Sequence, residues 1–299
     1  FAWGTSNPWG IDWNSEGQAF ITACVIPHLF HVIQGARYER QAGEHFGKYV
    51  FADLKTIADH AHWTGADPWA GNSRSGSVGG GHAHAGAMVY LGGAMPERYR
   101  DTLMMSNIHG NRVNNDLLER TRSGYVGRHA EDFLLADDRW FRGIHLKYGP
   151  DGAVYLIDWY DKQACHLTTP EIWDRTNGRI YRVSFGDAAP FDVDLSRHSA
   201  LELAQLQRHP NEWFARHARR LLQERGYDGD AERELRALFA SDEPLQQRLR
   251  ALWSLHAIGA ANDAFLREAM RSRDALVRAW AVQLESEDRA TDAAKAAVA

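Results

Sequence analysis

Short apolar runs separated by turn signals fill the first part of the chain. Runs of this length, rich in β-branched and aromatic residues and bounded by Gly, Pro, Asn and Asp, predict strands joined into hairpins. In the two clearest hairpins the paired strands are 10–13 with 19–25, and 143–146 with 153–159. The second pair encloses Gly-Pro-Asp-Gly at 149–152, which is a strong signal for a tight turn.

A weaker hairpin is predicted at 103–108 and 113–119, and a closing strand at 178–184. Recurring short hairpins with glycines between them favour a β-propeller or a similar closed all-β array. Since a four-stranded blade takes about 40–50 residues, 1–186 has room for about three to four blades. We therefore predict that 1–186 forms the C-terminal blades of a β-propeller, a partial all-β domain.

Helical spacing replaces the strand pattern after Gly186. The chain becomes rich in Ala, Leu, Arg and Glu, with apolar residues three or four apart. Three such segments align at offsets of about 30 residues, the scale of HEAT-like helix pairs, on Arg216, Arg248 and Arg278. The predicted order is a linker at 187–194, an α-helical HEAT-like solenoid at 195–288 and a frayed tail at 289–299. A solenoid of this kind serves as a binding surface or as a spacer, and we favour the spacer.

A long polar insertion, 43–81, lies between the first strands and the middle of the first domain. Apolar residues in 46–62 recur at spacings of three or four, which predicts a helix there. The rest of the insertion is rich in Gly and Ser, which predicts a flexible loop, either a lid over a site or a decoration.

Charge and hydropathy exclude some classes of function. The 299 residues carry a net charge of -5 without a basic stripe, so we expect no nucleic-acid partner. No run of about 20 apolar residues occurs, so no transmembrane segment is expected. The first residues, FAWGTSNPWG, have neither an initiator Met nor a signal peptide, which predicts a fragment or a processed chain. Cys24 and Cys165 are either a disulfide or two buried thiols, and no Cys-x-x-Cys-His haem site is present.

The richest candidate chemistry lies in 79–112. In Gly-His-Ala-His-Ala-Gly, His82 and His84 are two apart, so both imidazoles point to the same side if the segment is extended. The small neighbours allow a backbone or a ligand to approach closely. The turn SNIHGNR adds polar side chains at Asn107, His109, Asn111 and Arg112. The alternative to a functional site is that these histidines are structural and hydrogen-bonded.

A second polar group surrounds the hairpin that begins at 143. Arg139, Trp140 and Arg142 precede it, and Asp158, Asp161 and Lys162 follow it. Paired arginines suit carboxylate ligands, and aspartate oxygens suit Ca²⁺. The alternative is a structural ion-pair network between neighbouring blades.

Several long motifs resemble a known family. They are NPWGIDW, TACVIPHLFHVIQGARYER, GGHAHAGAMVYLGGAMPERYRDTLMMSNIHGNRVNNDLLER, SGYVGRHAEDFLLADDRWFRGIHLKYGPDGAVYLIDWYD and TNGRIYRV. Together they cover nearly all of 1–186 and resemble the large planctomycete-type membrane-bound dehydrogenases. Those proteins join a propeller similar to quinoprotein glucose/sorbosone dehydrogenases to HEAT repeats and often to a cytochrome c module, which this chain lacks.

The resemblance implies a periplasmic or cell-envelope quinoprotein dehydrogenase that oxidises a sugar or an alcohol. Hydride would pass to pyrroloquinoline quinone beside Ca²⁺, and electrons would then pass to haem c on a cytochrome c domain outside this chain. By residue type, His109 or His84 is the expected base. The residues expected near the quinone are Arg112, Arg139, Arg142, Lys162, Asn107, Asn111 and Trp140, and those expected near a cation are Asp158, Asp161 and His82.

The sequence is also compatible with two other functions. One is a non-catalytic propeller–HEAT scaffold that binds glycans or protein partners, because propellers host many functions. The other is a metal-dependent hydrolase that uses His82, His84 and His109, although no His-Glu-x-x-His motif supports it.

Overall fold

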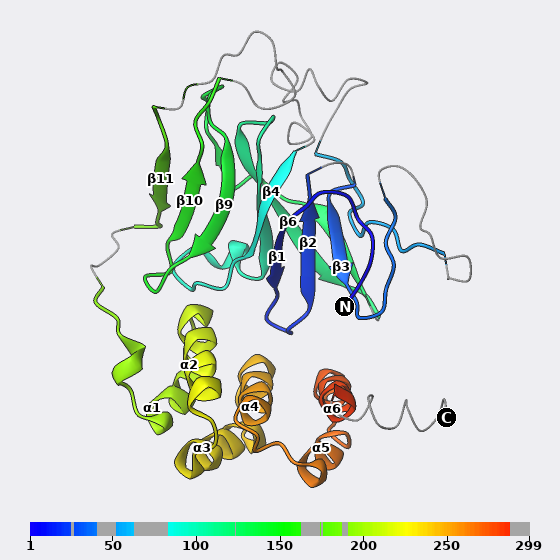
Figure 1. Ribbon diagram of the computed structural model, residues 1–299, viewed down its shortest axis with the longest axis vertical. Coiled ribbons are helices and arrows are strands. Elements are labelled where there is room, and N and C mark those ends of the chain that lie inside the picture. The colour runs from blue at the N-terminus through cyan, green and yellow to red at the C-terminus, as the bar shows by residue number, and fades with distance from the viewer. Residues whose placement is uncertain are drawn as a thin grey trace. The chain divides into compact units, whose positions relative to one another are not determined.

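The computed structural model describes residues 1–24, 27–40, 52–62, 83–122, 124–162, 174, 176–186 and 191–287. The chain divides into two compact units, Phe1–Pro190 and Phe191–Ala299. The first is sheet-rich and the second is helical (Figure 1), as the change in sequence pattern predicts. Among the described residues, no helix is both long and apolar enough to cross a membrane.

Within its described residues, the first unit contains three antiparallel sheets, each built from strands that follow one another along the chain. The first sheet has the order β1 (Pro8–Trp13), β2 (Ala19–Ala23) and β3 (Leu29–Val32). The second comprises β4 (His84–Val89), β5 (Thr102–Asn107), β6 (Arg112–Arg120) and β7 (Tyr125–His129), with β8 (Leu134–Leu135) also on β6. The third comprises β9 (Gly143–Tyr148), β10 (Val154–Asp158) and β11 (Arg179–Val183).

The predicted hairpins are confirmed. Strands β1 and β2 pair from Trp13 opposite Ala19, and the Asn14 side chain closes their turn by accepting the backbone N–H groups of Glu16 and Gln18. Strands β9 and β10 pair across the Pro-Asp-Gly turn, where Gly152 has a φ of +73°. A left-handed φ of this kind is tolerated by glycine and strained for most other residues.

The core of the first unit lies on β4 and β5, whose residues are all buried. Strand β1 packs against β4, and β9 packs against both β4 and β5. Two glycines permit this approach: a Cβ on Gly10 would lie 2.3 Å from the Ala87 nitrogen, and one on Gly86 would lie 3.1 Å from the His145 Cα. The small residues after His84 therefore serve close backbone packing.

The helix predicted at 46–62 is wrong over the part that the structure describes, 52–62. This segment is extended: Leu54 forms a parallel bridge with Tyr38, and Ala58 forms one with Gly127. The Ile57 N–H donates to the Leu29 carbonyl, and the Gly127 N–H donates to the Ile57 carbonyl. Backbone bonds to neighbouring segments outweigh the helical spacing of the apolar residues, because tertiary context overrides a weak local preference.

The second unit contains six α-helices within 191–287 (Figure 1). They are α1 (Ala200–Gln205), α2 (Glu212–Arg225), α3 (Gly229–Ala240), α4 (Leu245–Ala257), α5 (Asp263–Ala269) and α6 (Ala275–Glu287). Single 3₁₀ turns occur at Leu195–Arg197 and Leu206–Arg208 here, and at Glu97–Tyr99 in the first unit. A capping box at Ser199 and Glu202 starts α1, and the side chains of Asn211, Asp228 and Asn262 cap later helices.

Apolar stripes hold these helices together. Residues of α1 to α4 form one buried cluster, and residues of α4, α5 and α6 form two more. An ion pair between Arg250 and Glu212, both almost fully buried, joins α4 to α2. Each helix buries its stripe only by packing on the next, as in stacked helical arrays.

A leucine pair tests this packing. Leu252 is fully buried on α4, whereas Leu201 on α1 is 37% exposed. Leu252→Ala is expected to lower the free energy of unfolding by about 2–5 kcal/mol, since it leaves a cavity. Leu201→Ala is expected to change it by no more than about 0.5 kcal/mol. Chemical denaturation followed by circular dichroism at 222 nm checks both, and equal effects would contradict the described core.

Candidate functional site

The structure brings together most of the polar residues that the sequence analysis selects. Arg142 lies at the centre of this group, and its side chain is fully buried. Its guanidinium donates to the carbonyls of Ile108 (3.3 Å), Phe141 (2.8 Å) and Lys162 (3.1 Å). Because these carbonyls belong to separate segments, one cation holds the 107–112 turn beside both ends of the β9–β10 hairpin.

The 107–112 turn is fixed by its own amides. The Asn107 Oδ1 accepts the Gly110 N–H at 2.9 Å, and its Nδ2 donates to Asn114 Oδ1 at 3.0 Å. Asn111 has a left-handed φ of +53° and donates to the carbonyls of Arg139 (3.2 Å) and Phe141 (2.9 Å). His109 is buried within this turn, and Arg112 pairs with Asp132 at 2.9 Å.

The remaining predicted residues surround Arg142. Asp158 is buried, and its Oδ1 accepts the backbone N–H groups of Arg142 (2.7 Å) and Tyr160 (2.8 Å). Asp161 is also buried and accepts the Asp174 N–H at 3.2 Å, while its own N–H donates to the Trp140 carbonyl. Arg139 and Lys162 are exposed. His82 and Cys165 lie outside the described residues.

His84 belongs to a different group from His109. On β4 it lies opposite Asn107 in the register, and its Nε2 is 3.2 Å from the Nδ1 of His62. His62 is part of a second group, which consists of His28, His60, His62 and Asp116 and is called the histidine–aspartate cluster. None of these four residues was predicted from the sequence as a site residue. One candidate ligand atom from each of these four side chains lies within 4.8 Å of all the others.

Three atoms of the histidine–aspartate cluster form a tight triangle. The Nε2 atoms of His60 and His62 are 2.9 Å apart, and they lie 3.2 Å and 2.9 Å from Asp116 Oδ1. His28 Nε2 lies 3.1 Å from the other oxygen of the same carboxylate. The side chains of His28, His62 and Asp116 are between 0 and 1% exposed, and that of His60 is 12% exposed.

Further polar residues surround the cluster. The Nδ1 of His60 is 3.1 Å from Asp59 Oδ1, so a carboxylate orients this imidazole from behind. His129 places its Nδ1 at 3.7 Å from Asp116 Oδ1, and Asp132 lies on its other side. The His129 side chain is 25% exposed, which makes this the open side of the cluster.

Burial governs the charges in the cluster. Desolvation, followed by the charge of His28, lowers the pKa of His62 to about 3, so its imidazole is neutral at pH 7. Burial works to raise the pKa of the Asp116 carboxyl, but His62 and the polar contacts from His129, His28 and His60 outweigh it. They hold the pKa of Asp116 well below its usual range. The cluster thus combines the neutral imidazole of His62 with the ionised carboxylate of Asp116.

A signal for the cluster was present in the sequence. Residues 59–62 read Asp-His-Ala-His, which repeats the His-x-His spacing of 82–84. In a helix, residues two apart do not share a face, whereas in an extended chain they do. Because a helix was predicted at 46–62, His60 and His62 were not expected to lie on the same side of the chain. Nothing in the sequence placed His28 or Asp116 beside them.

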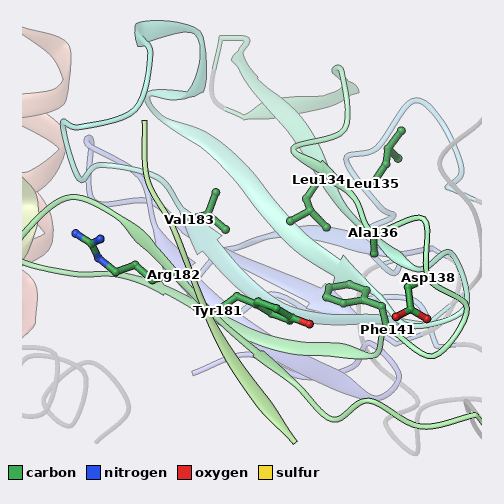
Figure 2. A pocket seen from close by; sticks show the side chains of 8 residues that line it. All are labelled: Leu134, Leu135, Ala136, Asp138, Phe141, Tyr181, Arg182 and Val183. Carbon is green, nitrogen blue, oxygen red and sulfur yellow. The ribbon is translucent and has the colours of Figure 1, made fainter. Parts of the chain in front are cut away.

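A pocket of about 300 Å³ lies close to the Arg142 group. Figure 2 shows its lining, which is Leu134, Leu135, Ala136, Asp138, Phe141, Tyr181, Arg182 and Val183. It lies between β8 and β11 and includes the segment that precedes Arg142. Leu135 is 64% exposed there, so the pocket is open to solvent, and Asp138 and Arg182 add two charged side chains to a lining that is otherwise aliphatic and aromatic.

The sheets and the buried polar groups define a sheet-rich domain with candidate binding chemistry at the ends of its strands. The chain belongs to the family of the domain of unknown function DUF7133, whose model matches residues 2–187. No curated protein matches the chain. A solved structure from Thermus thermophilus, provisionally assigned as an oxidoreductase (glucose dehydrogenase), is 15% identical with a TM-score of 0.38. That match covers 59% of this chain, which spans 45% of the length of the other.

Two arginines test the role of the Arg142 group. Arg142→Ala is expected to lower the free energy of unfolding by at least about 3 kcal/mol, because it leaves buried carbonyls without a charged donor. Arg139→Ala removes an exposed arginine three residues away and is expected to change it by no more than about 0.5 kcal/mol. Urea denaturation followed by tryptophan fluorescence makes the comparison. If Arg142→Ala were as stable as Arg139→Ala, the described network would not hold the segments together.

Proposed function

We propose that the first unit is the substrate and cofactor domain of an oxidoreductase that acts on sugars or alcohols. The observation that supports it best is the assembly around Arg142, because residues from 107–112, 139–142 and 158–162 lie in one place. Residues 107–112, 139–142 and 158–161 belong to the motifs that resemble the planctomycete-type membrane-bound dehydrogenases. Since His109 lies in the same turn, it is the proposed proton acceptor, with His84 as the alternative.

A buried oxygen supports the proposed cation. The Oδ2 of Asp158 is buried and has no hydrogen-bond partner among the described groups. Leaving such an oxygen unpartnered is costly, and a cation would satisfy it. We propose that Asp158 and Asp161 hold Ca²⁺; His82, which lies outside the described residues, stays a further predicted ligand.

The proposed quinone needs cations that can reach its carboxylates. Arg112 is engaged by Asp132 and Arg142 by backbone carbonyls, so these two contribute to shape and local charge. Arg139 and Lys162 are exposed at the edge of the same group, and we propose that they bind the carboxylates. We also propose that Asn107, Asn111 and Trp140 lie near the quinone, since Asn111 donates to the Arg139 carbonyl and the Trp140 carbonyl accepts the Asp161 N–H. Pyrroloquinoline quinone, when bound, would supply the hydride acceptor.

Other parts of the proposal concern architecture and location. The run of four antiparallel strands β4 to β7 supports a propeller blade, and the stacked helix pairs of the second unit support HEAT-like repeats. Electron transfer to a cytochrome c domain and a periplasmic or cell-envelope location are supported by the sequence resemblance alone.

One observation favours the scaffold alternative. Trp9, Ile11 and Trp13 alternate along β1, and each is between 45% and 48% exposed. Side chains two apart share one face of a strand, so these three form an apolar stripe. Exposed tryptophans stack on sugar rings, which makes glycan binding the second candidate function.

Dye reduction tests the oxidoreductase. The chain is expected to reduce an artificial electron acceptor with a sugar or an alcohol only when pyrroloquinoline quinone and Ca²⁺ are both present. His109→Ala is expected to lower kcat at least about 100-fold, the scale of general base catalysis, whereas the matched His256→Ala in the second unit leaves it unchanged. Glycan binding without turnover by the folded protein would favour the scaffold instead. Full activity of both His109→Ala and His84→Ala would remove the proposed base.

A further inference from the structure

We propose that His28, His60, His62 and Asp116 bind one divalent first-row transition-metal ion. The site is separate from the Asp158–Asp161 position and goes beyond the proposed oxidoreductase. It rests on the convergence of four side chains from β6, the segment at 59–62 and the residue just before β3.

The triangle of His60, His62 and Asp116 cannot be satisfied by protons alone. An ionised carboxylate oxygen only accepts, so both Nε2 atoms would need a proton to bond with Asp116 Oδ1. The two protonated nitrogens would then face each other at 2.9 Å. If one Nε2 atom were deprotonated instead, its lone pair would point at the carboxylate oxygen, and the two would repel each other. A cation between the three atoms removes the conflict, since all three present lone pairs to it.

The distances suit direct coordination. The sides of the triangle are 2.9, 2.9 and 3.2 Å. Ligands bound at about 2.1 Å lie roughly 3.0 Å apart in octahedral geometry and 3.4 Å apart in tetrahedral geometry. The observed sides lie close to these separations, so an ion close to the triangle reaches all three atoms. His28 supplies the fourth contact from the far side of the carboxylate, with a buried Nδ1 that has no hydrogen-bond partner among the described groups.

The surroundings resemble the outer shell of a metal site. A histidine ligand ordinarily donates its second ring nitrogen to a carboxylate or another acceptor, which fixes its orientation. His60 faces Asp59 in this way, and His62 faces His84. Both imidazoles therefore present the Nε2 atom to the triangle.

The ligand types select the class of metal. Three imidazoles and one carboxylate suit Zn²⁺, Fe²⁺, Co²⁺ and related ions, whereas Ca²⁺ and Mg²⁺ require mostly oxygen. His60 and His129 lie on the side with solvent exposure, which gives the ion a route of entry. The cluster is thus a site for a nitrogen-preferring ion.

Metal binding to the whole chain, purified without a polyhistidine tag and stripped with a chelator, tests this proposal. Isothermal titration is expected to show one Zn²⁺ per chain, and Co²⁺ is expected to give visible d–d absorption bands. Zn²⁺ is also expected to raise the melting temperature, because it binds the folded state only. Ca²⁺ at the same concentration is expected to leave the Zn²⁺ titration and the Co²⁺ bands unchanged, because its proposed site is at Asp158 and Asp161.

Variants locate the ion. His60→Ala, at the partly exposed ligand, and Asp116→Asn, which keeps the side-chain shape, are each expected to weaken Zn²⁺ binding at least about 100-fold. His145→Ala, on β9 and outside the cluster, is the matched control and is expected to bind Zn²⁺ as tightly as the unaltered chain. Circular dichroism confirms that each variant is folded.

Three results would overturn the proposal: no Zn²⁺ or Co²⁺ binding by the folded unaltered chain, full Zn²⁺ affinity in both ligand variants, or displacement of Zn²⁺ by equimolar Ca²⁺. The titration and spectrum of the unaltered chain decide the matter even if both variants fail to fold. Because these readouts measure binding, they are independent of the dye-reduction assay. A chain that binds Zn²⁺ but reduces no dye would support the metal site and contradict the proposed oxidoreductase.

Discussion

The buried carboxylate of Asp116 is the constraint on which this end of the first unit depends. An ionised group without solvent contact is stable only when partners replace its hydration. Here the partners come from separate parts of the chain: His28 before β3, His60 and His62 in the extended segment, and His129 at the end of β7. Each of these segments must be in place for the charge to be compensated. The geometry of the cluster therefore depends on the packing of all these segments against one another.

The Arg142 group shows the opposite arrangement. There the buried charge is a cation, and backbone carbonyls surround it. These carbonyls compensate the guanidinium charge without a second ionised group, and they fix their segments in position. Asp158 is therefore not needed to pair with the Arg142 guanidinium, and its Oδ2 stays buried without a hydrogen-bond partner among the described groups. One group is suited to hold polar loops around a small ligand, and the other is suited to hold a metal ion.

Strand β4 connects these two groups. His84 is its first residue, adjacent to Asn107 across the sheet and to His62 beyond it. The glycine at 86 and the alanines around it admit the backbones of β1 and β9, which brings the strand ends close together. Larger side chains would separate the strands, because interiors are close-packed and have no room to spare.

Local sequence patterns were enough to predict the change from strands to helices near 186, the principal hairpins and the polar character of 107–112 and 137–162. These features rest on local spacing and turn chemistry, which act over a few residues. These patterns did not predict that 52–62 is extended. The apolar spacing there favours a helix, but backbone hydrogen bonds to β3 and β7 hold the segment extended. The patterns also did not place Asp116 beside His28, His60 and His62. Their meeting depends on contacts between residues up to 88 positions apart, and only the tertiary structure decides contacts at that range.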